Sequence, residues 1–217
     1  MNNIFSADIA WSWLVIRSSG IVAWALLSAV VFWGLFLRTR ILGTKSTPVA
    51  LLNMHRWLGA LALGALTVHL VALLIDPVVH FTLAQILIPG MAPWEPIPVA
   101  LGTLALWFML PVSAIGRLRT KLGKKGNVLF KRSHLIAYFA WPLATAHYLL
   151  AGTDALAEWS IALVLTVSIV LIFLLLARGY VSPAARKANR PQPNKASVSS
   201  ASLPSESSAA PEKISVG

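Results

Sequence analysis

Residues 52–70 read LNMHRWLGALALGALTVHL, and this stretch places His55 and His69 fourteen positions apart in nearly uninterrupted apolar sequence. The apolar run extends on both sides to cover Val49–Ile75, with Arg56 as its one charged residue. A helix needs roughly 20 mostly apolar residues to cross a bilayer. The stretch therefore predicts a membrane-spanning helix that carries two imidazoles at two different depths.

Four further segments have, or nearly have, the length and composition of membrane-spanning helices. They are Trp13–Leu37, Ile97–Ile115, His134–Ala151 and Trp159–Ala177. Hydrophobic residues make up 57% of the 217 residues and charged residues only 12%, which is about half the charged fraction of a typical soluble domain. We therefore predict an all-α fold, a polytopic membrane helical bundle with about five transmembrane helices.

The basic residues predict the orientation of this bundle. Apart from Arg17, every Lys and Arg lies in 38–56, 117–132 or 178–213, whereas the alternate segments carry only acidic charges: Asp8, Asp76, Glu95, Asp154 and Glu158. The positive-inside rule then puts the N-terminus outside and the C-terminus in the cytoplasm of a multi-pass protein of the cytoplasmic membrane. Because the basic residues flank apolar runs, the net charge of +11 indicates a lipid bilayer as partner and no nucleic acid.

Composition divides the chain into three parts. Residues 1–12 form a short outer N-terminal segment, 13–178 the membrane domain, and 179–217 a tail rich in Ser, Ala and Pro that we expect to be disordered in the cytoplasm. In the proline-rich outer loop, we expect Phe81–Ile88 to form a short interfacial helix. Gly123–Gly126 lacks the spacing of a phosphate-binding loop and is interpreted as a cytoplasmic turn.

A second histidine pair, His134 and His147, stands thirteen positions apart in the fourth apolar segment. At about 1.5 Å per residue, the members of each pair are separated by about 20 Å along their helix. Both helices run from the inner to the outer side, so His55 and His134 share the inner level while His69 and His147 share the outer one. Two facing imidazoles at one level can bind a haem iron from both sides, and such a haem transfers electrons.

One feature of the second pair does not follow from regular helix geometry. A fourteen-residue step returns to nearly the same helix face at about 100° per residue, but a thirteen-residue step does not. Pro142 lies between His134 and His147 and must distort the helix there. The sequence predicts a distortion at this point, but it does not predict whether the distortion aligns the two histidines.

The residue types present exclude several other kinds of site. The chain has no Cys, which excludes disulfides, iron–sulfur clusters and thiolate-bound haem. Histidines three to four turns apart cannot reach a single metal ion. A purely structural role for the histidines would be hydrogen bonding between helices. The alternative function is a non-redox membrane transporter or scaffold with its intramembrane histidines in a proton relay. Such a protein would need intramembrane carboxylates or broken helices, and the predicted spans contain no Asp or Glu before their outer ends. His80 stands alone in the outer loop.

The stretches 52–59 with His69, and 133–135 with His147, resemble the ferric reductase-like transmembrane domain, which is shared by ferric reductases and NADPH oxidases. The haem ligands of that family are two histidines on each of two helices, separated by thirteen and twelve residues, and both intervals recur here. Arg17–Gly20 and His147–Asp154 add to the resemblance. It implies that 13–178 is a cytochrome b-like domain with two b-type haems, whose irons are bound by His55 with His134 and by His69 with His147.

The larger enzymes of that family add a cytoplasmic flavin and nicotinamide domain. The tail 179–217 is too short and polar to be one, and no glycine-rich phosphate-binding loop is present, so no flavin or NAD(P) site is expected in this chain. The resemblance thus implies the membrane electron-transfer component of an oxidoreductase. Its electron donor would be separate, a flavoprotein reductase or a quinol, and its acceptor would lie outside.

Basic and small residues near the histidines are candidates for further contacts with the haems. Arg17 lies in the outer part of the first span, where we expect it to pair with an outer haem propionate, with snorkelling to headgroups as the alternative. Arg56, together with Lys131 and Arg132, can pair with the inner propionates or serve only as topology signals. Gly59 and Gly64 can leave room for a macrocycle or for close helix packing.

Overall fold

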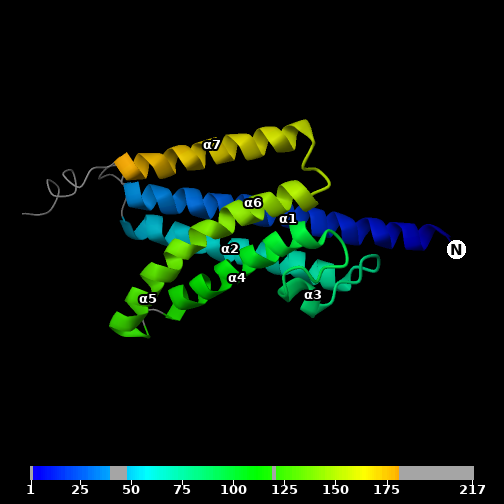
Figure 1. The fold of residues 1–217 in the computed structure, drawn as a ribbon, viewed down its shortest axis with the longest axis horizontal. Coiled ribbons are helices and arrows are strands. Elements are labelled where there is room, and N and C mark those ends of the chain that lie inside the picture. Colours follow the sequence, from blue (N-terminus) through cyan, green and yellow to red (C-terminus); the bar gives the residue numbers. More distant parts are fainter. Residues whose placement is uncertain (1, 40–47, 119–120, 181–217) are drawn as a thin grey trace, which may run out of the picture. The chain divides into compact units, whose positions relative to one another are not determined.

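The computed structural model describes residues 2–39, 48–118 and 121–180, and these ranges are helical with short connections and no strand. Four helices are long: α1 (Asn2–Thr39), α2 (Pro48–Ile75), α4 (Pro96–Leu118) and α7 (Glu158–Tyr180). The shorter elements are α3 (Leu83–Leu87), α5 (Gly123–Ile136), the 3₁₀ segment η2 (Ala137–Phe139) and α6 (Ala140–Ala151) (Figure 1). The all-α prediction is confirmed.

Four helices of the described ranges are long and apolar enough to cross a membrane: Trp11–Leu37, Val49–Ile75, Pro96–Leu118 and Glu158–Ala177. They correspond to four of the five expected spans, and the polytopic bundle is confirmed. The fifth expected span, His134–Ala151, is not a single α-helix. It consists of the end of α5, then η2, then α6. η2 ends three residues before Pro142 and lies in the turn that the proline ring crowds and from which the missing N–H removes one hydrogen bond.

The connecting segments agree in part with the sequence analysis. The short helix expected at Phe81–Ile88 is α3, which begins with a capping box between Thr82 and Gln85. The stretch Gly123–Gly126 is the first turn of α5, so its interpretation as a non-helical turn was wrong. α1 begins at Asn2 and runs through most of the expected segment 1–12. The predicted disordered tail lies, from Val181 onward, outside the described residues.

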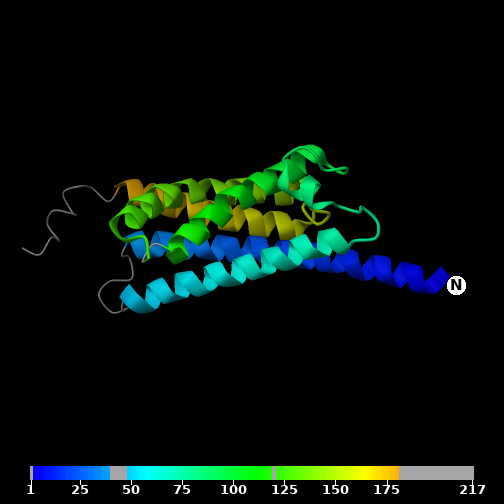
Figure 2. The same cartoon turned by 90° about the horizontal axis from the view of Figure 1, so that it is seen from below.

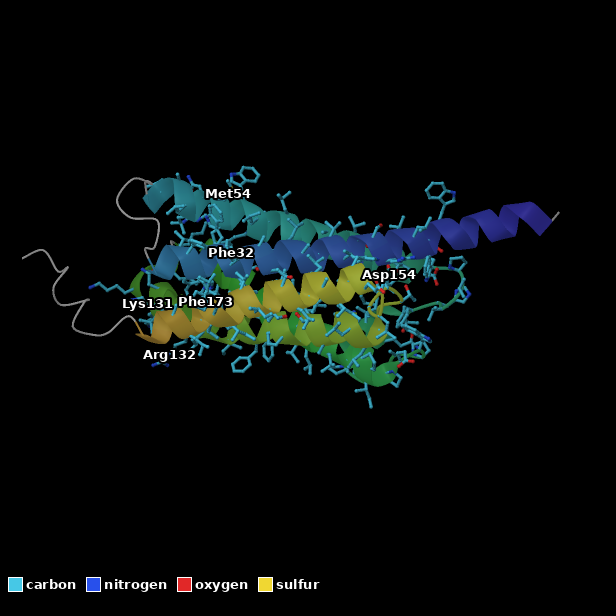
Figure 3. The ribbon with its side chains drawn as sticks, turned by 90° about the horizontal axis from the view of Figure 1, so that it is seen from above. Phe32, Met54, Lys131, Arg132, Asp154 and Phe173 are labelled. Atoms are coloured by element: carbon cyan, nitrogen blue, oxygen red, sulfur yellow. The ribbon has the colours of Figure 1, made fainter. Side chains whose placement is uncertain are left out.

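Consecutive long helices alternate in direction, so their ends gather in two places (Figures 1 and 2). We call one the basic end, because it carries Arg117, Lys121, Lys124, Lys125, Lys131 and Arg132, and the other the acidic end, because it carries Asp76, Glu95, Asp154 and Glu158. Figure 3 shows Lys131 and Arg132 at the basic end, with Asp154 toward the other. α2 and the α5–α6 run therefore point the same way, from the basic end to the acidic end.

The outward faces of the long helices are apolar. On α7 the exposed side chains include Ile169 (65%) and Phe173 (67%), and on α2 they include Trp57 (69%) and Leu61 (54%). Soluble proteins rarely expose continuous apolar surface along the length of a helix. Such surface is typical of helices in contact with lipid chains. The inward faces of α1 and α7 meet in a core around Leu35, which is 1% exposed.

α1 and α6 are joined by two reciprocal side-chain bridges. Trp24 Nε1 donates to Thr145 Oγ1 (3.0 Å), and that hydroxyl donates to the carbonyl of Trp141 (2.9 Å). Trp141 Nε1 donates to Ser28 Oγ (2.9 Å), which donates to the carbonyl of Trp24 (2.9 Å). Each helix thus contributes a tryptophan and a hydroxyl four residues later. We call these four residues the Trp–hydroxyl clamp, and it fixes the register of α1 against α6.

Candidate functional site

The structure brings the two histidines nearer the basic end side by side. The ring centroids of His55 on α2 and His134 on α5 are 6.0 Å apart, with an angle of 71° between the ring planes. A metal–imidazole bond is about 2 Å long and the ring centroid lies about 1 Å beyond the nitrogen, so two imidazoles on opposite sides of one ion have centroids about 6 Å apart. The separation of this pair therefore fits one ion between the rings.

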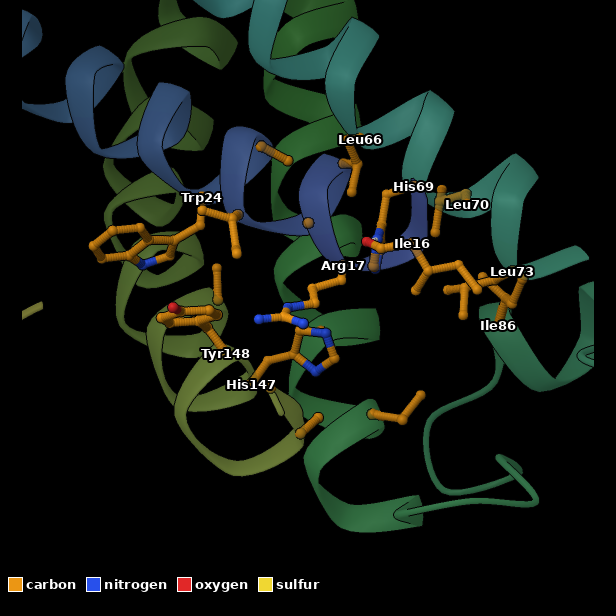
Figure 4. A pocket seen from close by; sticks show the side chains of 18 of the residues that line it. Ile16, Arg17, Trp24, Leu66, His69, Leu70, Leu73, Ile86, His147 and Tyr148 are labelled. Atoms are coloured by element: carbon orange, nitrogen blue, oxygen red, sulfur yellow. Dashed lines mark hydrogen bonds between the residues drawn. The ribbon is translucent and has the colours of Figure 1, made fainter. Parts of the chain in front are cut away.

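The two histidines nearer the acidic end, His69 on α2 and His147 on α6, line one cavity of about 710 Å³. Its walls are mainly apolar and come from α1, α2, α3, α4 and α6; they include Trp24, Leu66, Leu70, Leu73, Ile86 and Tyr148 (Figure 4). Cofactor sites usually have volumes of about 300–1,000 Å³, with apolar walls and a few directed polar groups. The cavity has both properties.

Backbone carbonyls orient both imidazoles of this cavity. His69 Nδ1 lies 2.9 Å from the carbonyl oxygen of Ile16 on α1, and His147 Nδ1 lies 2.8 Å from that of Pro98 on α4. A carbonyl oxygen only accepts, so in each ring Nδ1 carries the proton and Nε2 keeps a lone pair. A carbonyl bound at the far nitrogen is the usual way in which proteins orient a metal-binding histidine.

The imidazoles of the other pair are held differently. Nδ1 of His55 and Nδ1 of His134 are buried and have no hydrogen-bond partner. The ring of His134 packs against Phe130, with centroids 5.0 Å apart. A buried nitrogen without a partner is unfavourable. These two rings are therefore the least satisfied polar groups of the site.

The 3₁₀ segment reduces the misalignment of His134 and His147. Thirteen residues of regular α-helix fall about 140° short of four full turns. The three residues of η2, wound at about 3.0 residues per turn, recover about 60° of that shortfall. The distortion predicted at Pro142 therefore acts in the direction that turns the two imidazoles toward one side of the run.

Arg17 forms an ion pair that the sequence analysis did not predict. Its Nε and Nη2 donate to the two carboxylate oxygens of Asp154, in the connection after α6. The guanidinium also lies over the ring of Trp13, 4.7 Å from its centroid. Arg17 and Asp154 both line the cavity, with exposed fractions of 34% and 12%. The pairing of Arg17 with a haem propionate stays a prediction.

The remaining candidates lie around the site. Arg56, Lys131 and Arg132 are exposed near the basic end, and their contact with propionates stays a prediction. His80 lies between α2 and α3 with a φ of 52° and is not among the cavity's lining residues. A Cβ added at Gly59 or Gly64 would meet no atom within 4 Å. The glycines that do contact histidines are on α1 and α4, where sequence reasoning did not look.

Two pairs of partly buried imidazoles, at two levels of a helical bundle, define the class: a polytopic membrane protein with histidines gathered between its helices. Residues 19–145, more than half of the chain, match the profile of the family described as ferric reductase like transmembrane component. The chain belongs to this family, which gives it a membrane electron-transfer role. The match includes His55, His69 and His134 and ends two residues before His147. No curated protein and no solved structure matches the chain significantly.

Proposed function

We propose that this chain binds two b-type haems and carries electrons across the cytoplasmic membrane. His55 and His134 bind one iron, and His69 and His147 bind the other. The observation that carries the proposal is the cavity of about 710 Å³, in which two imidazoles keep Nε2 free because their Nδ1 atoms are bonded to Ile16 and Pro98. The 6.0 Å separation of His55 and His134 supports the same arrangement at the second level.

The chain's own residues hold and insulate the centres. When bound, a haem supplies one-electron chemistry, because its iron changes oxidation state without bond changes in the macrocycle. The apolar walls around Leu66, Leu70 and Leu73 exclude water from the site. Arg17 uses two N–H groups on Asp154, and its guanidinium has three more for an anionic propionate in the same cavity.

The charge distribution supports one direction of transfer. By the positive-inside rule the basic end is cytoplasmic, so the N-terminus is outside and the C-terminus inside. Electrons then enter at the level of His55 and leave at the level of His69. A negative interior favours this outward movement by about 2.3 kcal/mol per 100 mV. The donor is a separate flavoprotein reductase or a quinol, and the acceptor lies outside.

A transporter or scaffold is the alternative, and the helix interruption at η2 is the observation that favours it. Transporters often break helices around a site at the bilayer midplane. Here, however, the charged pair in the cavity wall, Arg17 and Asp154, involves a connection at the acidic end and not the middle of the bundle.

The test is the haem content of the purified full-length chain. Pyridine haemochrome absorbance against protein mass should give two b-type haems per chain, and the spectrum should be that of low-spin iron with two axial imidazoles. Replacing His80 with Ala is the matched control and should change neither quantity. A chain that is expressed with adequate haem supply and contains none would overturn the electron-transfer proposal in favour of the alternative.

A further inference from the structure

Three of the four histidines rest against a glycine of a neighbouring helix. A Cβ at Gly20 would lie 3.1 Å from Cε1 of His69, and a Cβ at Gly34 would lie 3.3 Å from Cε1 of His55. At Gly102 the crowding is greatest, since a Cβ would lie 3.0 Å from both Cγ and Nδ1 of His147. Carbon atoms in contact prefer about 3.5–4.0 Å, so any side chain at these positions must displace an imidazole.

For two of these histidines, the carbonyl that accepts from the imidazole belongs to the residue four positions before the glycine. For His69 the two residues are Ile16 and Gly20, and for His147 they are Pro98 and Gly102. Helix geometry explains the interval, because each Cβ points toward the helix N-terminus and covers the turn below it. A ring that donates to the carbonyl of residue i must occupy the space that the side chain of residue i+4 would otherwise fill.

The arrangement repeats along α1 with the interval of the histidines themselves. Gly34 lies fourteen positions after Gly20, and the ring of His55 lies against it as the ring of His69 lies against Gly20. Because α1 and α2 are antiparallel neighbours, a fourteen-residue repeat on one faces a fourteen-residue repeat on the other. The glycine contact therefore recurs at both histidines of α2, whereas the hydrogen bond to a carbonyl is present at His69.

We propose that Gly20, Gly34 and Gly102 are positioning residues for the haem-binding imidazoles. Each provides a seat, defined as the space that a glycine leaves for one histidine ring, which sets the height of that ring. At Gly20 and Gly102 a carbonyl four residues earlier also bonds the ring and sets its rotation. The inference rests on the proposed function, since the seats matter for electron transfer only if the rings bind iron. Gly20 and Gly102 act on the centre of His69 and His147, and Gly34 acts on the centre of His55 and His134.

The fourth position departs from this pattern. Gly116 lies fourteen positions after Gly102, where α4 would seat His134, but a Cβ there would meet Phe130, at 3.2 Å from Cε2. Phe130 in turn packs against the ring of His134. The thirteen-residue interval between His134 and His147 accounts for the difference, because it leaves His134 out of step with the repeat of α4. His134 therefore packs against a phenyl ring in place of a seat.

The experiment compares G20A, G34A and G102A with G64A in the full chain. Gly64 lies nine residues after His55, on the opposite face of α2, and is not among the residues that line the cavity. It is exposed, and an added Cβ there meets no atom within 4 Å, so the structure gives it no contact with a haem site and G64A controls for the general effect of Ala in a membrane helix. The readouts are haem stoichiometry, the electron paramagnetic resonance signals of the two ferric low-spin centres, and their separate reduction potentials. Single variants H147A and H134A assign each signal to a level.

The expected result is selective for one level. G102A should lose at least half of the low-spin signal assigned to His147, G20A should shift or weaken the same signal less, and G34A should alter only the signal assigned to His134. G64A should match the wild type. If G102A does not accumulate, G20A reports on the same centre. Unchanged signals in G20A and G34A, with two haems in the wild type, would overturn the seats alone, whereas a wild type without haem would overturn the proposed function.

Discussion

At the scale of single residues, Arg17 places a positive charge within a membrane helix. A lone cation in a membrane helix is unfavourable by about 2.5–3.5 kcal/mol near the helix centre, and the ion pair with Asp154 reduces that penalty. Two donors of the guanidinium are used in this pair. Whether Arg17 serves stability alone, or also binds a propionate, can be separated by changing each partner in turn.

We expect D154N and R17Q to differ in their effect on haem. D154N should lower the free energy of unfolding by about 1–2 kcal/mol, because the pair is only partly shielded from solvent, but it keeps the cation in the cavity wall and should retain most haem. R17Q should lose stability and also reduce haem at the level of His69. Thermal unfolding and haemochrome assays measure the two effects. Equal haem loss in both variants would mean that Arg17 acts only through Asp154.

The sequence predicts some of these residues and not others, for a physical reason. His55 and His69 can be predicted as a pair because fourteen residues are nearly four full turns of α-helix, which puts both side chains on one face. Asp154 and Gly102 act across helices, on Arg17 and His147, and no periodicity within one segment reveals such a partner. The fourteen-residue interval from Gly20 to Gly34 is present in the sequence, but it gains meaning only once α1 is known to face α2.

At the scale of elements, the Trp–hydroxyl clamp determines how α1 and α6 meet. α1 carries two seats for the histidines of α2, and α6 carries His147, so a slip of one helix along the other would change the spacing of both levels. Hydrogen bonds between membrane helices average about 0.6 kcal/mol and reach about 1.7 kcal/mol. Two reciprocal bridges between the same helices are expected to depend on each other.

We expect W24F and W141F each to lower the free energy of unfolding by about 1 kcal/mol, because each removes an indole N–H from a buried hydroxyl. The double variant should be less destabilised than the sum of the two, since either change loosens the same helix contact. Detergent unfolding followed by circular dichroism measures this. T166V is the control, because Thr166 donates only to Ala162 in its own helix. Strict additivity would contradict a shared function of the two bridges.

The interruption before α6 gives the second prediction at this scale. P142A restores a backbone donor and removes the ring that crowds the preceding turn, so η2 should relax toward α-helix. The residues before it should then rotate back by about 60°, carrying His134 away from His55. We expect loss of the low-spin signal at that level and retention of the signal at His147, measured by electron paramagnetic resonance. An unchanged pair of signals would show that tertiary packing alone sets the position of His134.

The same segment shows where sequence reasoning about elements stops. Pro142 predicts a distortion, and the structure has one, but propensity does not say whether a proline produces a kink, a tightened turn or a break. The expected fifth span is therefore not among the four membrane-length helices of the described residues, and its first residues belong to α5. α5 begins at Gly123 in polar sequence that was interpreted as a turn, because two glycines within four residues are unfavourable in a helix.

For the whole molecule, the alternation of helix directions places the histidines of two helices at two depths of the bundle. α2 and the α5–α6 run point the same way, so histidines with similar intervals meet partners at both depths. The proposed orientation in the membrane rests on the distribution of charge alone. Reporter fusions in the loop after Asp76 and after Lys121 should therefore report opposite compartments, with the second in the cytoplasm. Identical compartments for both would contradict the topology and, with it, the assignment of inner and outer levels.

The two levels lie about 20 Å apart along α2, and this separation leads to the last prediction. In vesicles with a reductant enclosed and an oxidant outside, the wild type should transfer electrons across the bilayer. H147A and H69A should each abolish transfer while the centre at His55 stays reducible from the side of the basic end. The double variant H69A/H147A should lose little more, because both residues serve one centre. H134A should give the mirror result, with the acidic-end centre intact and no longer reducible from inside. A haem signal at the level of His55 that disappeared in H69A/H147A, with the protein still folded, would contradict the pairing by level.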